Sequence, residues 1–287
     1  MFDLRYHVAS LVAVFVALIV GILVGVGLAG SGVTNKADLK LAQQRQRDAQ
    51  AAAQSYKQQR DQAQMLSGAF GLAYPELMNG LLSGKRIGVL YVGSVDSGVN
   101  QSIGQTLQDA GAAPPMRTVS LSIPVNAPNL DSSLFEKGGK FIKYVGNDKL
   151  ETLGNALGQE FATGGQTPLW KTLGRQLLSQ RNGNQRQPLD GVVVVRTVKP
   201  QQGDTMRFLR GLYSGLASAD VPAVGVENTG TKVTAVKIFR ARGLSAVDDI
   251  DQQTGRAALA FLLAGAPPGT FGTGPNADAI LPTPPSG

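Results

Sequence analysis

One uninterrupted apolar run near the start of the chain constrains the fold more than any other feature. Val8 to Ala29 contains no charged residue and a single hydroxyl, at Ser10. As a helix it would be about 33 Å long, enough to cross a bilayer core of about 30 Å. The sequence therefore predicts a transmembrane helix at 8–29, preceded by a tail at 1–7, and the charges that flank the helix leave its orientation open. The run is longer than the usual core of a cleaved signal peptide, which favours an uncleaved anchor.

Small residues repeat every fourth position along this run. Spaced in this way, they form a shallow groove where a second membrane helix can approach closely, and the G-x-x-x-G motif lies at its centre. We expect self-association here, although Gly and Ala are common in membrane helices in general. The predicted helix–helix interface consists of Ala13, Ala17, Gly21, Gly25 and Ala29.

The next segment, 36–66, has no Gly or Pro and is rich in Gln, Ala, Lys and Arg. This composition predicts a helical stalk with a weak coiled-coil heptad. An isolated solvated helix is the alternative. The seam of the heptad is formed by Ala42, Ala49, Tyr56 and Ala63. A short turn-rich connector is expected between Gly68 and Gly84.

Strand-like and helix-like segments alternate from residue 85 to residue 265. A buried strand that runs into a Gly turn is expected at Ile87–Gly93, and the run of four Val residues within Gly191–Thr197 is typical of a strand that is covered on both faces. Helices are expected at 99–110, 150–161, 168–181, 204–219 and 254–264, and further strands at 116–121, 221–226 and 233–239; residues 126–146 are ambiguous. We therefore predict a Rossmann- or flavodoxin-like α/β domain with a mainly parallel sheet, followed by a Pro/Gly-rich tail at 266–287.

Candidate catalytic and metal-binding patterns are weak. Gly93 and Gly98 have the spacing of a phosphate-binding loop, but Val99 and Asn100 replace the required Lys and Ser/Thr, which favours a tight turn. Asp248, Asp249, Asp251 and Glu227 could offer oxygen ligands to Mg²⁺ or Ca²⁺, but without EF-hand spacing, and Thr254 is expected to cap the last helix. We expect neither an enzyme nor a bound cofactor or metal.

Soft metal ligands are scarce in the sequence. The chain has no Cys, one His and five Met, and His7 lies beside the predicted anchor. Cu(I) prefers thiolate and thioether ligands, followed by imidazole. We therefore expect no tight copper site in the domain. The net charge of +7 is scattered along the chain, which suits anionic lipid or envelope polymer and not nucleic acid.

Five segments carry a family resemblance: the first 28 residues, the strand from Ile87, the segment 224–228, the stretch from Ser245 to Gly265 and the stretch from Gly272 to Pro282. They resemble the actinobacterial family labelled copper transporter MctB, which also includes the cell-separation protein SteB. The motif positions are Asp248, Asp251, Gly255 and Arg256; relatives often have Pro where this chain has Thr254.

The resemblance implies a single-pass protein of the cell membrane with a cytoplasmic tail at 1–7 and an extracytoplasmic C-terminal domain. It also implies two alternative functions. We expect a non-catalytic envelope scaffold that regulates peptidoglycan hydrolysis during cell separation; the alternative is copper transport, efflux or homeostasis. The expected partners are the lipid bilayer and a second copy of the chain or a membrane protein, with an envelope polymer or a peptidoglycan hydrolase as further candidates.

Overall fold

The structure is a computed structural model that describes residue 17 and residues 33–285. The chain divides into two compact units, Met1–Ala69 and Phe70–Gly287. The long helix α2 (Val33–Met78) begins in the first unit and ends in the second. Residues 40–60 of this helix are exposed, so the predicted stalk seam of Ala42, Ala49 and Tyr56, and likewise Ala63, lies on an open helix surface.

Helix α2 continues through the region where the sequence predicted a turn-rich connector. It passes Gly68 and Gly71 and contains Pro75. Residues 79–84 are turns, as predicted, but the prediction was wrong as far as Met78. The last turns of α2 pack into the core of the second unit, where Tyr74 and Met78 are buried at positions four residues apart. Tertiary packing of this face outweighs the low helix propensity of Gly and Pro.

The second unit is built on a seven-stranded mixed sheet with the order β3-β2-β1-β4-β5-β6-β7. Every neighbouring pair is parallel except β2 and β3, so the prediction of a mainly parallel α/β sheet is confirmed. The strand order reverses between β1 and β4, as in doubly wound folds. The strands are β1 (Ile87–Val92), β2 (Arg117–Leu121), β3 (Leu178–Gly183), β4 (Gly191–Arg196), β5 (Ala223–Val226), β6 (Ser245–Val247) and β7 (Thr270–Phe271).

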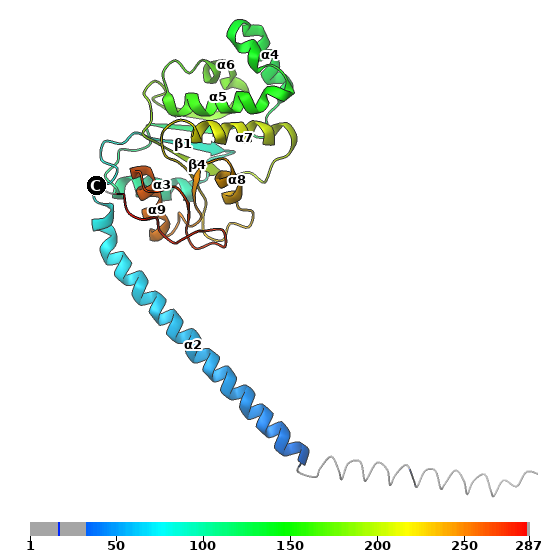
Figure 1. Cartoon of the computed structure of the whole chain (residues 1–287), viewed down its shortest axis with the longest axis vertical. Coiled ribbons are helices and arrows are strands. Elements are labelled where there is room, and N and C mark those ends of the chain that lie inside the picture. Colours follow the sequence, from blue (N-terminus) through cyan, green and yellow to red (C-terminus); the bar gives the residue numbers. More distant parts are fainter. Residues whose placement is uncertain (1–16, 18–32, 286–287) are drawn as a thin grey trace, which may run out of the picture. The chain divides into compact units, whose positions relative to one another are not determined.

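Helices cover both faces of this sheet (Figure 1). The buried hydrophobic side chains form two clusters, one on each face of the sheet. One face carries α5 and α7, and the other carries α3 and α9 together with the end of α2. The helices are α3 (Ser97–Asp109), α4 (Ala127–Lys137), α5 (Leu150–Thr163), α6 (Pro168–Leu177), α7 (Gly203–Ala217), α8 (Val236–Ala241) and α9 (Gln253–Ala264), with short 3-10 helices η1 (Gly139–Tyr144) and η2 (Asn147–Lys149).

Helices α5 and α7 cross at unusually close range because each has two glycines in the contact. A Cβ atom at Gly211 of α7 would lie 1.9 Å from the carbonyl oxygen of Glu151, and one at Gly154 of α5 would lie 2.2 Å from that of Phe208. Gly158 and Gly215 repeat this arrangement one turn further along. The spacing, Gly-x-x-x-Gly in both helices, allows the two backbones to touch.

Three elements differ from the sequence-based prediction. The helix expected to reach Arg181 ends at Leu177, and β3 follows it as an edge strand paired with β2. The strand expected at 233–239 is instead the helix α8. Its Phe239 ring packs over β5, where the absent side chain of Gly225 leaves room: a Cβ there would lie 2.1 Å from the ring.

The expected cap of α9 is also wrong. Gln252 is the N-cap and makes no capping side-chain bond, while the Thr254 hydroxyl donates to Asp249 Oδ2 at 3.2 Å. The side chain of Thr254 therefore ties the first turn of α9 to the acidic loop after β6.

Candidate functional site

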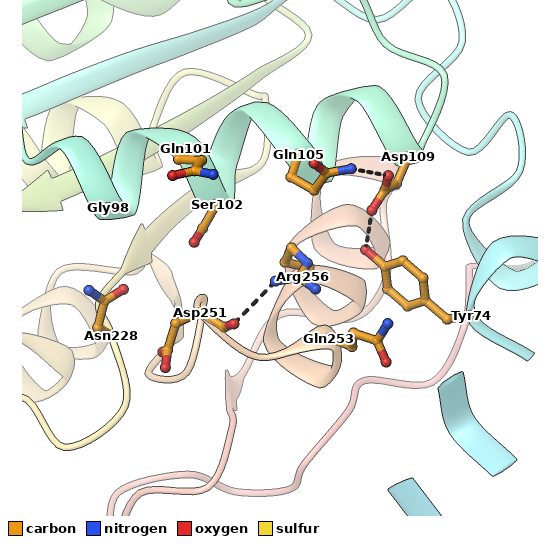
Figure 2. A pocket seen from close by; sticks show the side chains of 10 residues that line it. All are labelled: Tyr74, Gly98, Gln101, Ser102, Gln105, Asp109, Asn228, Asp251, Gln253 and Arg256. Atoms are coloured by element: carbon orange, nitrogen blue, oxygen red, sulfur yellow. Dashed lines mark hydrogen bonds between the residues drawn. The ribbon is translucent and has the colours of Figure 1, made fainter. Parts of the chain in front are cut away.

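A polar groove of about 670 Å³ runs between α3 and α9, and Figure 2 shows its lining from close by. We call it the α3–α9 groove. Helix α3 contributes Gly98, Gln101, Ser102, Gln105 and Asp109. The opposite wall comes from α2, the loops after β5 and β6, and α9, and consists of Tyr74, Asn228, Asp251, Gln253 and Arg256.

The α3 wall is a stripe of hydrogen-bonding side chains at helical spacing. Gln101, Gln105 and Asp109 follow one another at four-residue intervals, which places them on one face of the helix. Ile103 and Leu107, by contrast, are buried. A helix was predicted at 99–110, but its polar stripe was not. The four-residue spacing of the amide and carboxylate side chains would have indicated the stripe.

The side chains of Tyr74 and Asp109 close the end of the groove nearest α2. The Tyr74 hydroxyl donates to Asp109 Oδ2 at 2.8 Å, and the Gln105 amide donates to Asp109 Oδ1 at 2.6 Å. Burial, followed by this bond to Asp109, raises the pKa of Tyr74 to about 12. Asp109 is therefore held as a hydrogen-bond acceptor by partners from two helices.

Arg256 lies beside this pair, on the same wall as Tyr74 (Figure 2). Its Nη1 donates to the backbone oxygen of Asp251 at 3.1 Å, and its guanidinium lies 5.9 Å from the centre of the Tyr74 ring. Arg256 Nε and Asn228 Oδ1 are both shielded from solvent and have no hydrogen-bond partner among the described residues. Both atoms are buried behind the groove surface, within side chains that line it.

The clustered carboxylates of the β5 and β6 loops serve separate structural roles. Asp248 accepts from the backbone N–H groups of Thr273 and Gly274 at 3.0 and 3.1 Å. Asp251 accepts from the backbone N–H of Thr229 at 2.6 Å, and Glu227 accepts from that of Ala235 at 2.9 Å. In residues 17 and 33–285, no three acidic or His side chains come together as a metal site.

Asp249 is the most perturbed of these carboxyl groups. Burial, reinforced by the neighbouring carboxylates Asp248 and Asp251 and opposed by the Thr254 hydroxyl, raises its pKa to about 6. Its Oδ1 has no partner within the described part of the chain. For Asp251, the hydrogen bonds from Thr229 and Gln252 outweigh burial and lower the pKa.

These opposite shifts predict opposite effects of Asp249→Asn and Asp251→Asn. The folded state binds the Asp249 proton more tightly than the unfolded state, so this contribution to stability is complete below pH 3.8 and is lost as the pH rises through about 6. As the pH rises through this range, the free energy of unfolding of Asp249→Asn should increase relative to that of the wild type by up to about 3 kcal/mol, since one pKa unit is about 1.4 kcal/mol.

Urea unfolding of the full chain at pH 4.5 and 7.5, followed by the fluorescence of the single Trp, Trp170, measures this difference. Asp251→Asn is the matched control and should be destabilising at pH 7.5, because a lowered pKa adds stability above the normal value. A difference between Asp249→Asn and the wild type that does not change with pH would contradict the assignment.

The Gly93–Gly98 segment is the tight turn that the sequence favoured over a phosphate-binding loop. Asp96 is the N-cap of α3 and accepts from the Val99 N–H at 2.8 Å, so its carboxylate occupies the position that an anion would take. Gly93 has a φ of +110°, and a Cβ there would lie 2.6 Å from Thr197 Oγ1. The loop after β4 thus fills the crevice where the strand order reverses.

Most of the predicted helix–helix interface lies outside the described residues. Ala13, Gly21, Gly25 and Ala29 are not among them, and Ala17 is an exposed helical residue. Within residues 33–285, no helix has both the length and the apolar composition that a membrane span requires.

Comparison with known families gives one result. The model of the family described as "Copper transport outer membrane protein, MctB" matches residues 1–282. This chain belongs to the MctB family. No curated protein matches the chain.

The MctB-like segments identified from the sequence meet in the fold of this family member. Asn228, Asp251 and Arg256 come from two separate segments, and all three line the α3–α9 groove. Asp248 instead holds the segment that starts at Gly272, where a Cβ atom would lie 2.0 Å from Asp248 Oδ1. Gly255 packs against the loop after β6: a Cβ atom there would lie 2.1 Å from the Asp249 carbonyl oxygen. The motif residues therefore divide into those that line the groove, Asp251 and Arg256, and those that pack behind it, Asp248 and Gly255.

Proposed function

We propose that this chain acts in copper transport as a non-catalytic, membrane-anchored accessory protein, and that the α3–α9 groove is its binding surface. The family description supports the copper assignment over regulation of peptidoglycan hydrolysis, which we had expected first. As in that expectation, the chain acts as a non-catalytic scaffold. The proposal includes a single-pass anchor at 8–29 and an extracytoplasmic domain.

The groove is the observation that carries this proposal. Its walls offer four side-chain amides, two hydroxyls, two carboxylates and a guanidinium. Such a surface suits a hydrogen-bonding partner, either a protein loop or an envelope polymer. It does not suit Cu(I), which favours sulfur and imidazole ligands.

Two of the three methionines of the domain lie on opposite sides of the sheet. Met78 is fully buried in the cluster on the α3–α9 side of the sheet, and Met116 packs against the cluster on the opposite side. The thioethers of Met78 and Met116 therefore cannot bind the same copper ion. The copper function is therefore assigned to a complex in which this chain positions a partner, and not to ligands of its own.

Two measurements on the full chain test this proposal. A strain lacking the chain should show altered copper tolerance that the wild-type chain restores. The purified full chain in detergent, titrated with Cu(I) against a competing chelator, should show no stoichiometric binding at sub-micromolar affinity. Unaltered tolerance would contradict the copper role, whereas tight stoichiometric binding would make the chain a copper carrier itself.

A further inference from the structure

A second pocket, of about 810 Å³, lies at the opposite edge of the sheet, where α6 begins and β3 ends. Lys171 of α6, Arg181 of β3 and Arg186 of the following loop line it, together with Thr167 and Gln185. We call it the basic pocket. None of its three cations takes part in an ion pair among the residues that the structure describes.

The walls of the basic pocket are fixed by a buried arginine. Arg117 is fully buried, and its guanidinium donates to the carbonyl oxygens of Phe161 at 2.9 Å, Gln185 at 3.3 Å and Gln187. The Gly165 N–H donates to the Arg186 carbonyl oxygen at 2.7 Å. These bonds clamp the backbone of the loop that carries Arg186 against the loop that carries Thr167, so the backbone that forms this wall of the pocket is fixed.

The same arginine adds positive charge that no carboxylate balances within the described residues. Burial, followed by the charges of Arg181 and Arg86, lowers the pKa of Arg117 to about 10. The nearby acid Glu160 acts on Arg181 through its charge, and its carboxylate accepts from the N–H groups of Leu169 and Trp170 at the start of α6, at 3.0 and 3.3 Å. The surroundings of the pocket therefore favour an anion.

We propose that the basic pocket binds a phosphate-bearing ligand. Two guanidinium groups and one ammonium group match the several oxygens and the multiple charge of a phosphate better than the single charge of a carboxylate. The pocket volume leaves room for more than one phosphate group. The phosphate can belong to a soluble or polymeric compound or to a lipid headgroup, and this site is independent of the α3–α9 groove.

Calorimetric titration of the full chain in neutral detergent with inorganic pyrophosphate at low ionic strength tests the site. We expect Arg181→Gln/Arg186→Gln to weaken binding about tenfold or more, since charge-assisted bonds are lost. The matched control is Lys199→Gln/Lys237→Gln, which removes the same charge from exposed positions outside the pocket and should bind as the wild type does. Lys171→Gln, at an exposed position, replaces the double variant if that variant fails to fold.

Competition then identifies the source of the phosphate. Displacement of pyrophosphate mainly by short-chain phosphatidylglycerol would indicate a lipid headgroup, and displacement mainly by glycerol 3-phosphate would indicate a soluble or polymeric ligand. Absence of pyrophosphate binding by the wild type would overturn the proposal. Equal weakening in the control variant would also overturn it, because binding would then follow the net charge alone.

Discussion

Gly211→Ala should cost the domain about 3 kcal/mol or more of its free energy of unfolding. The added methyl group would lie 1.9 Å from the Glu151 carbonyl oxygen, and a backbone atom cannot rotate away as a side chain can. Helices α5 and α7 would have to separate, which would loosen the core on that face of the sheet. With total stabilities of about 5–15 kcal/mol, such a loss is a large fraction of the whole.

Trp170 reports this loss directly. It is buried, donates from Nε1 to the Leu157 carbonyl oxygen of α5 at 2.9 Å, and is the single Trp in the sequence. Its fluorescence during urea unfolding of the full chain should show a clearly lowered midpoint for Gly211→Ala. The matched control is Gly104→Ala in α3, where a new Cβ meets no atom within 4 Å.

The control substitution should be neutral or stabilising by up to about 1 kcal/mol, because Ala is the better helix former. The comparison thus separates the helix-propensity effect of replacing Gly from the steric effect of the α5–α7 contact. An unchanged midpoint for Gly211→Ala would show that the two helices do not approach as closely as the structure has them.

The parts of the fold that could be predicted from the sequence are those whose signal is local. β1, and β4 as far as Val195, carry apolar side chains on both faces because both faces are covered, and this is visible in the sequence itself. β3, by contrast, reads LSQRNG and becomes a strand only because it pairs with β2. Likewise, α8 depends on Glu227 at its start and on the space above Gly225, neither of which is local to the helix.

The candidate site was only partly predictable for the same reason. Asp251 and Arg256 were marked by the family resemblance, and both line the groove. Tyr74 and Asp109 form the end of the groove only because α2 continues past Pro75 to dock on α3, which the composition of that segment argued against. A groove assembled from residues as distant as 74 and 256 follows from the tertiary fold and not from a sequence motif.

The central claim, that the α3–α9 groove is the working surface in copper transport, predicts a large effect of Gln101→Trp. Gln101 is exposed on α3 and lines the groove, so an indole there would fill the space without disturbing the core. Gln108→Trp is the matched control, since Gln108 is exposed on the same helix but does not line the groove.

The decisive measurement is the copper content and copper tolerance of a strain that lacks the chain and carries each variant at equal protein levels. The wild type and Gln108→Trp should restore both quantities, whereas Gln101→Trp should leave the strain close to the one without the chain. Full restoration by Gln101→Trp would contradict the account, because copper transport would then not depend on an open groove.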